Sequence, residues 1–220
     1  MDVHVNAATK VATLAGVADA PFDRLVIVLE SFVDGDAVRA VILGLEDAGS
    51  MPALFPDEAL WLQRFPLPCI AAASGELTGL ALQLALSCDI RVCDRDTVFA
   101  GLPVGSARLL SLVGEAGCIE LFQSRLRVDA QTALRLGLVS EAAPRAKSLA
   151  AAQRLAATIA SRGPIATRLA KESLWRGREM PLETALRFET DLTLLLQTTK
   201  DRAEGIAAFL EKRTPTFTGN

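Results

Sequence analysis

The stretch "PCIAAASGELTGLALQLALSCDIRV", residues 68–92, decides the fold. It predicts a buried strand, a turn at Gly75, an apolar helix over about 79–88 and a second strand. Such a turn often presents backbone N–H groups to a ligand, because the first N–H groups of a helix have no partner within it. Inside this helix, where we would look for a reactive carboxylate, the chain has Gln83.

The residues before this stretch predict strands and helices in alternation, beginning with "DVHVN", whose alternating pattern indicates a short strand. The run "DAVRAVILGL" is compact, apolar and β-branched, which is typical of a buried parallel strand. Residues 21–35 begin with a proline and end in Asp-Gly, and we interpret them as a helix, although their apolar residues also suit a strand. A helix that leads into such a strand makes a βαβ unit. The loop "EDAGSMPALFP" and a short helix, "DEALWLQRF", follow.

After residue 92 the pattern becomes mainly helical. "DTVFAGL" predicts one more strand, and "LLSLVGEAGCIELFQSRL" begins the helices. The next helix has Asp129 as its N-cap and Gly137 as its stop, and four further helices complete the chain. We therefore predict an α/β fold with two parts, a core over residues 1–143 and a helical C-terminal region over residues 144–220.

Composition limits the class of protein. The chain has 220 residues, half of them apolar, which is enough for one sizeable core. Its net charge of −3 argues against nucleic acid as the main partner. No apolar run reaches the ~18 residues of a membrane span. The start, "MDVHVNAATKV", lacks the basic and apolar blocks of a secretory signal, so we expect a cytoplasmic protein with no membrane partner.

The scarcity of some residue types excludes several kinds of site. The single histidine, His4, argues against a His-based triad and against a metal site with several histidines. The chain has no tyrosine, which removes another common acid or oxyanion donor. The four cysteines form no CxxC pair and are expected to be reduced. We expect no metal.

Four stretches in order resemble the crotonase superfamily, the enoyl-CoA hydratase/isomerase fold. They are "VRAVIL", "IAAASGELTGLALQLALSCDI", "TALRLGLVSEA" and "DRAEGIAAFLEKRTPTF", and the match runs from about Val3 to Phe217. The resemblance implies a crotonase/ClpP-like spiral of ββα units, with a helical C-terminal region that forms homotrimers or hexamers. It also implies an acyl-CoA or acyl-carrier-protein substrate, in which coenzyme A is part of the substrate and no separate cofactor is needed.

In this family, two backbone N–H groups bind the thioester oxygen and stabilise an enolate. The resemblance places one of them at Leu80, directly after Gly79, where the family prefers a second glycine. It places the other near Pro52, which has no N–H group. An alignment shifted by one residue would move that donor to Met51 or Ala53.

The resemblance also places the two glutamates of family hydratases. One falls on Gln83, four residues after Gly79, and glutamine cannot act as a base near neutral pH. The other, from the motif F-G-x-P-E, falls on Val104, directly after Pro103. Each positioned acid or base is typically worth about 10²–10⁴-fold in rate, so conventional water addition is not expected.

Other polar residues near the turn are candidate substitutes. Glu76 follows Gly75 and could act as a base, although a surface carboxylate in a turn is the more common case. For Asp89 we favour a structural hydrogen bond. The remaining candidates are Ser106, Arg108, Glu115 and Glu120.

Residues of the C-terminal motif are candidates for binding coenzyme A. The resemblance implies that Lys212 reaches the ligand of a neighbouring subunit, with Arg213 beside it. An ordinary solvated helix face is the alternative. Phe209 is expected to pack in the core or at a subunit contact.

Two functional hypotheses follow. The first is a divergent crotonase that acts on an acyl thioester through enolate stabilisation, as an isomerase, a decarboxylase or a dehydrating lyase in polyketide or other secondary metabolism. The second is a non-catalytic accessory subunit that assists a biosynthetic partner enzyme.

Overall fold

The computed structural model describes residues 1–46, 54–102, 107–123 and 127–220. Over these residues the strands form a main sheet of six, in the order β1-β2-β3-β4-β6-β9, and a smaller sheet in the order β5-β7-β8. The main sheet contains β1 (Asp2–Asn6), β2 (Val11–Ala15), β3 (Ala40–Leu45), β4 (Cys69–Ala73), β6 (Ile90–Asp94) and β9 (Glu141–Ala143). The smaller sheet contains β5 (Glu76–Leu77), β7 (Val98–Ala100) and β8 (Arg127–Asp129).

The main sheet is parallel from β2 onward. β1 pairs with β2 in the antiparallel sense, and each later neighbour is parallel, as the registers Val11↔Ala40 and Ile42↔Ile70 show. Helix α1 (Phe22–Glu30) connects β2 to β3, so the predicted helix and the predicted βαβ unit are confirmed. Because parallel strands end at the same edge, the loops after β2, β3, β4 and β6 meet there.

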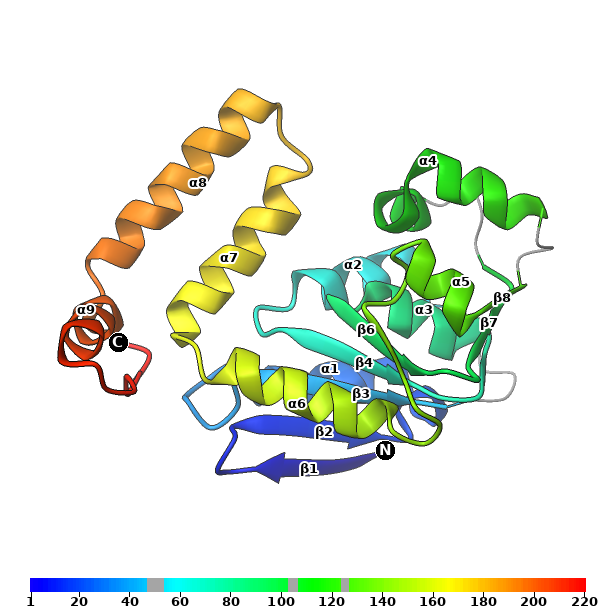
Figure 1. Ribbon diagram of the computed structural model, residues 1–220, viewed down its shortest axis with the longest axis horizontal. Helices are drawn as coiled ribbons and strands as arrows, with labels where there is room; N and C mark the ends of the chain where they lie inside the picture. The colour runs from blue at the N-terminus through cyan, green and yellow to red at the C-terminus, as the bar shows by residue number, and fades with distance from the viewer. Residues whose placement is uncertain (47–53, 103–106, 124–126) are drawn as a thin grey trace.

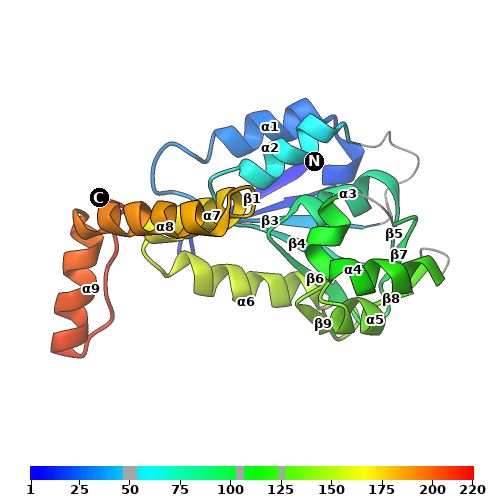
Figure 2. The same ribbon diagram turned by 90° about the horizontal axis from the view of Figure 1, so that it is seen from above.

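Alternate residues of the buried strands supply two apolar layers. In β3, Val41 and Leu43 belong to one cluster of buried side chains, whereas Ala40 and Ile42 belong to the other. Helices α1, α2 (Pro56–Arg64) and α3 (Gly79–Ser87) cover the first face, and α6 (Ser148–Ala160) covers the second. Figure 2 shows the sheet between these two layers of helices.

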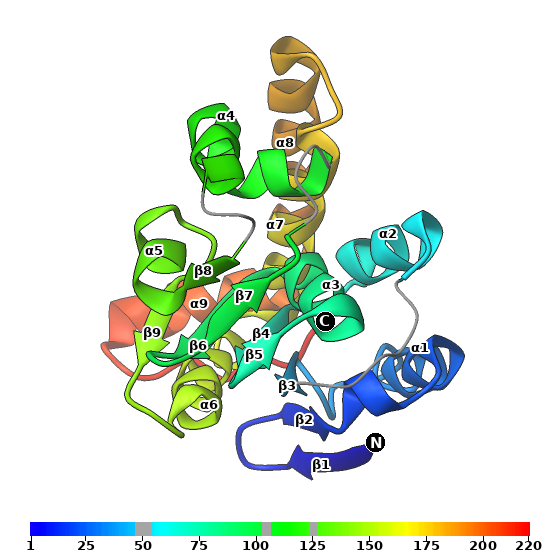
Figure 3. The ribbon, with the colours of Figure 1, turned by 90° about the vertical axis from the view of Figure 1, so that its right-hand side faces the viewer.

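The smaller sheet extends the fold beyond the main sheet. Strand β5 lies between β4 and α3 in the chain, and Figure 3 shows it beside β7 and β8. Asp129 accepts a hydrogen bond from the Thr132 N–H group at the start of α5 (Ala130–Arg135), which confirms the predicted N-cap. Helix α4 (Ala107–Gln123) is interrupted at Gly114, whose φ is +71°.

The sequence analysis did not predict four strands of the described chain, namely β2, β5, β8 and β9. Strand β5 has two residues, and β8 and β9 have three each, which is too short for a periodic pattern. Strand β2 reads "VATLA", whose alanines carry a weak strand preference. These strands form because neighbouring backbone groups pair with them.

The C-terminal helices leave the body of the molecule. Helices α7 (Pro164–Gly177) and α8 (Leu182–Gln197) form a hairpin, and α9 (Lys200–Glu211) follows where α8 ends, at the open end of the hairpin (Figure 1). The Arg39 guanidinium donates to the carbonyl of Ala160 at 3.3 Å and to that of Phe217 at 2.7 Å, which ties the last residues to the sheet. The division at residue 143 stays a prediction, and α6, just after it, packs on the main sheet.

Arg91 provides a test of the polar contacts in the interior. Its Nε donates to the carbonyl of Leu138 at 2.6 Å, and its Nη1 donates to that of Cys88 at 2.7 Å. We expect Arg91→Met to lower the free energy of unfolding by about 1–3 kcal/mol, because buried carbonyls lose their donor. Urea unfolding measures this. The control Arg95→Met, on an exposed side chain of the following turn, should stay within about 0.5 kcal/mol; equal losses would contradict the assignment.

Candidate active site

Helix α3 is the central element of the candidate site. Its side chains are almost all apolar, and seven of them are buried: Leu80, Ala81, Leu82, Leu84, Ala85, Leu86 and Ser87. The turn before the helix is made by two glycines with positive φ, Gly75 at +70° and Gly79 at +46°. Other residues rarely adopt this conformation, so these glycines set the direction in which the chain enters the helix.

The N-terminal turn of α3 offers backbone donors. The N–H groups of a first helical turn have no acceptor within the helix, and the aligned peptide dipoles make this end electropositive. In the described structure, the side chain of Thr78, the N-cap residue, makes no capping hydrogen bond. The N–H group of Leu80 lies in this turn, as predicted. The side chain of Leu80 is only 5% exposed. The side chain therefore packs inward, into the apolar core.

Guanidinium groups occupy the opposite end of α3. Arg108 donates from Nε to the carbonyl of Leu86 at 2.6 Å and from Nη2 to that of Cys88 at 3.1 Å, and Arg91 also donates to Cys88. Burial, followed by repulsion from Arg91 and Arg178, lowers the pKa of Arg108 to about 10. Cations at a helix C-terminus complement its negative end. The arrangement leaves the N-terminal end of α3 as the end suited to an anion or a carbonyl oxygen.

Gln83 forms a hydrogen bond with the segment just before α2. Its Oε1 accepts a hydrogen bond from the backbone N–H group of Leu54 at 2.5 Å. Leu54 lies just before α2, and Gln83 is half-buried one turn inside α3. The side chain therefore links α3 to the segment before α2.

Glu76, another predicted catalytic residue, is engaged by an arginine. It lies in β5, and both of its oxygens accept from Arg127 of β8, one of them at 2.9 Å. The hydrogen bonds from Arg127 lower the pKa of Glu76, which makes this carboxylate a weaker base at neutral pH. Its catalytic role stays a prediction.

The remaining predicted residues are widely separated. Gly79, Leu80 and Gln83 share α3, whereas Lys212 follows α9, with a left-handed backbone, at the far side of the molecule (Figure 1). Arg213 pairs with Glu204 and Glu211 of the same chain. A role for Lys212 in ligand binding stays a prediction, and it would require a second chain.

The other candidates have structural partners or lie outside the described residues. Asp89 accepts from the Cys69 N–H group at 2.8 Å and from Lys171 at 2.6 Å, as its expected structural role requires. Glu120 pairs with Arg135. Phe209 is 81% exposed, so the expectation that it packs in the core is wrong, and a subunit contact remains. Positions outside the described residues are Met51, Pro52, Ala53, Pro103, Val104 and Ser106.

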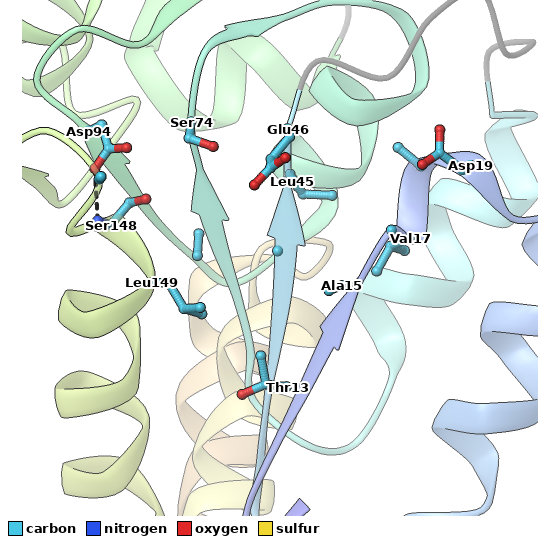
Figure 4. A pocket seen from close by; sticks show the side chains of 15 residues that line it. Thr13, Ala15, Val17, Asp19, Leu45, Glu46, Ser74, Asp94, Ser148 and Leu149 are labelled. Atoms are coloured by element: carbon cyan, nitrogen blue, oxygen red, sulfur yellow. Dashed lines mark hydrogen bonds between the residues drawn. The ribbon is translucent and has the colours of Figure 1, made fainter. Parts of the chain in front are cut away.

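The sequence analysis missed a cavity at the carboxyl edge of the main sheet. It has a volume of about 440 Å³ and lies after β2, β3, β4 and β6, against the start of α6. Figure 4 shows Asp19, Glu46, Ser74, Asp94 and Ser148 around it. Ends of parallel strands are a common place for ligands, and that rule would have pointed to this edge.

The cavity is acidic. Asp19, Glu46 and Asp94 line it, and none of its lining residues is basic. Asp94 is buried and accepts from the N–H groups of Lys147 and Ser148, so it caps α6. None of the five predicted site residues lines the cavity. Three carboxylates would repel phosphates, so this space is unsuited to the phosphate groups of a nucleotide.

The part of the chain that the structure describes contains neither a metal-binding cluster nor a membrane-spanning helix. No group of three or more histidine, cysteine, aspartate or glutamate side chains there could hold a metal ion. None of the helices is both long enough and apolar enough to cross a membrane.

Comparison with known proteins identifies the class. The sequence profile of the enoyl-CoA hydratase/isomerase family matches residues 45–220. The chain belongs to this family, so the resemblance inferred from the sequence is confirmed. A 2,3-dehydroadipyl-CoA hydratase of Escherichia coli strain K12 is 39% identical over 172 residues, covering 73% of this chain and 67% of that protein. A probable mitochondrial enoyl-CoA hydratase 2 of Arabidopsis thaliana is 35% identical over 170 residues, covering 73% of this chain and 56% of that protein.

Solved structures agree on the fold. An enoyl-CoA hydratase from Bacillus anthracis superimposes with a TM-score of 0.83 over the full length of both chains, at 28% identity. The Pseudomonas aeruginosa protein DspI superimposes with a TM-score of 0.80, covering 98% of this chain and 96% of that one, at 27% identity. The predicted α/β crotonase fold is therefore confirmed.

Two substitutions at Gln83 distinguish a structural role of this side chain from a catalytic one. We expect Gln83→Leu to lower the free energy of unfolding by about 1–2 kcal/mol, because the Leu54 N–H group loses its acceptor. Gln83→Glu keeps an acceptor oxygen and should unfold near the wild-type urea concentration. It should also fail to hydrate crotonyl-CoA, because valine stands at position 104. Strong hydration by this variant would show that Val104 does not occupy the position of the second glutamate.

Proposed function

We propose that this protein binds an acyl-CoA thioester with its carbonyl oxygen at the N-terminal turn of α3 and stabilises the enolate form of the acyl group. The observation that carries the proposal is the polarity of α3, with free donors at one end and guanidinium groups at the other. Preorganised N–H groups in a water-poor site favour the state in which negative charge develops on oxygen. The relatives reported above are named as hydratases of CoA esters, which supports this substrate class.

The proposed reaction does not use the two catalytic carboxylates that water addition requires. Gln83 accepts a backbone hydrogen bond and has no carboxylate to offer, and valine stands where the second glutamate is expected. Glu76 is paired with Arg127. We infer an isomerisation, decarboxylation or dehydration, in which the protein mainly holds the enolate and the substrate supplies much of the acid–base chemistry. A place in polyketide or other secondary metabolism belongs to this proposal, as does a carrier protein in place of coenzyme A.

One observation favours the alternative, a non-catalytic accessory subunit. The candidate polar side chains Gln83, Glu76 and Asp89, in and beside α3, are all engaged by other groups of the protein. A chain that has lost its reactive carboxylates would retain the fold and its assembly surfaces. Ligand binding without turnover would be the signature of such a subunit.

The position of the acidic cavity bears on how coenzyme A would lie. Asp19 and Glu46 stand beside the ends of β2 and β3. The phosphates of a bound coenzyme A would avoid them, so we infer that the nucleotide extends away from this cavity. Lys212 of a second chain remains the proposed phosphate partner.

Two substitutions at Leu80 test the oxyanion donor. Leu80→Pro removes one N–H group, and proline is tolerated in a first helical turn. Leu80→Ala removes a buried side chain but keeps the N–H group. We expect acetoacetyl-CoA to raise the melting temperature of the wild type and of Leu80→Ala, and to leave Leu80→Pro unchanged. A ligand at one hundred times its dissociation constant adds about 2.7 kcal/mol, which makes the difference measurable.

The controls for this experiment are free coenzyme A and circular dichroism of both variants. Equal stabilisation of all three proteins by acetoacetyl-CoA would exclude the Leu80 N–H group as the donor. No stabilisation of the wild type by any acyl-CoA would overturn the proposed function.

We also propose that α8 and α9 assemble the protein into trimers or hexamers. Large apolar side chains are exposed on both helices, among them Leu182 at 76%, Phe209 at 81% and Leu210 at 73%. Apolar patches of this kind usually mark contact surfaces. Removing the residues after Thr198 should therefore give monomers or aggregates by size-exclusion chromatography with light scattering. A soluble trimer from the truncated chain would place the assembly contacts elsewhere.

A further inference from the structure

A second cavity lies at the opposite edge of the main sheet from the acidic one. Its volume is about 720 Å³, within the usual range for small-molecule sites. Pro68 and Asp89, which directly precede β4 and β6, line it, so it faces the amino ends of these strands. We call this cavity the basic groove. Its lining contains Asp89 and Arg108, two of the further candidates from the sequence, but none of Glu76, Gly79, Leu80, Gln83 and Lys212. It approaches α3 through Arg108, which donates to carbonyls at the C-terminal end of that helix.

The floor of the basic groove is apolar. It is supplied by α4, α6 and α7, through the side chains of Leu112, Ile159, Ala166, Ala170, Leu174 and Trp175. Leu174 is 74% exposed, so its side chain is accessible at this floor. A surface of this composition suits a hydrocarbon chain.

The polar side chains of the groove carry an excess of positive charge. Arg108, Arg162, Lys171 and Arg178 line it, with Asp89 as the single carboxylate among the lining residues. Lys171 already pairs with Asp89 at 2.6 Å. Three guanidinium groups therefore remain around an apolar floor without a counter-charge in the lining.

Arg162 and Arg178 differ from most other arginines of the described chain in having no carboxylate partner. Arg127, Arg135, Arg154 and Arg187 each pair with a glutamate of the same chain. Within the described ranges, Arg162 and Arg178 have no carboxylate within 4.0 Å, and Arg178 has only a 3.4 Å contact with the Ser111 hydroxyl. Burial, followed by the nearby charges of Arg91 and Arg178, lowers the pKa of Arg108. Like charges at close range repel one another.

We propose that the basic groove binds a single-chain amphiphile with an anionic head, of the long-chain carboxylate class. The hydrocarbon chain lies on the apolar floor, and the head group lies among Arg108, Arg162 and Arg178. An anion there relieves the repulsion among the guanidinium groups, and the chain covers Leu174 and Trp175. The head group also contacts Arg108, which donates to the last carbonyls of α3.

Trp175 provides a direct probe. The chain has two tryptophans, and the other, Trp61, stacks on Phe65 with ring centroids 5.6 Å apart and does not line the groove. We expect dodecanoate, titrated below its micelle concentration, to change tryptophan fluorescence in a saturable manner with one site per chain. The Trp175→Phe variant should lose this response and keep the emission of Trp61.

The double variant Arg162→Gln/Arg178→Gln tests whether the positive charge of the groove binds the anionic head group. It should bind dodecanoate at least tenfold more weakly, whereas the matched control Arg95→Gln, on an exposed arginine outside the groove, should bind as the wild type does. Dodecanol and dodecyltrimethylammonium should bind more weakly than dodecanoate. Dodecyl phosphate in place of dodecanoate distinguishes a phosphate head from a carboxylate head.

The outcomes that overturn the proposal are clear. They are the absence of a saturable response, an equal response in Trp175→Phe, unchanged affinity in the double variant, or equal binding of the alcohol. A groove covered by a second chain would give the first of these. Leu80→Pro should bind dodecanoate normally, and excess acetoacetyl-CoA should not displace it, so failure here is distinguishable from failure of the proposed function.

Discussion

The capping of helix α3 is the interaction on which the rest of the structure depends. An almost wholly apolar helix lies buried between the main sheet and the surrounding helices, and its last carbonyls receive guanidinium groups from Arg91 and Arg108. Buried carbonyls without donors would cost free energy, so both ends of this helix constrain their surroundings. One end is satisfied by side chains of the protein. The other end, at Gly79 and Leu80, is where we propose that the thioester oxygen binds.

The same helix shows why glutamine at position 83 suits the fold. Gln83 accepts the Leu54 N–H group, a role that needs only an oxygen. A glutamate at this position can accept the same bond, but its second oxygen would remain for chemistry. Glutamine therefore makes this structural contact and supplies no carboxylate base. Glu76 is similarly held by Arg127, so charge near the turn is balanced within the protein.

Charge is divided between the two edges of the main sheet. The carboxyl edge bears Asp19, Glu46 and Asp94, whereas the amino edge bears the arginines of the basic groove. A net charge of −3 conceals this separation, because the two groups of side chains nearly cancel in the sum. Helix α3 connects the two edges: its N-terminal turn is the proposed thioester site, and Arg108 at its C-terminal end lines the basic groove.

The sequence by itself determined the α/β class, the family and the places of the long elements. Strand β3, helix α3 and the N-cap at Asp129 follow from apolar periodicity, glycine and capping chemistry, which act over a few residues. It also placed Leu80 and Gln83 on α3. Strands of two or three residues escaped prediction, because pairing with distant backbone groups creates them. The acidic cavity and the basic groove escaped for the same reason. Arg108 and Arg178 lie 70 positions apart in the numbering and meet only when α4 and α7 fold beside one surface. Local preferences depend on residues that are close in the sequence. The charge around a cavity depends on residues that come together only when the chain has folded.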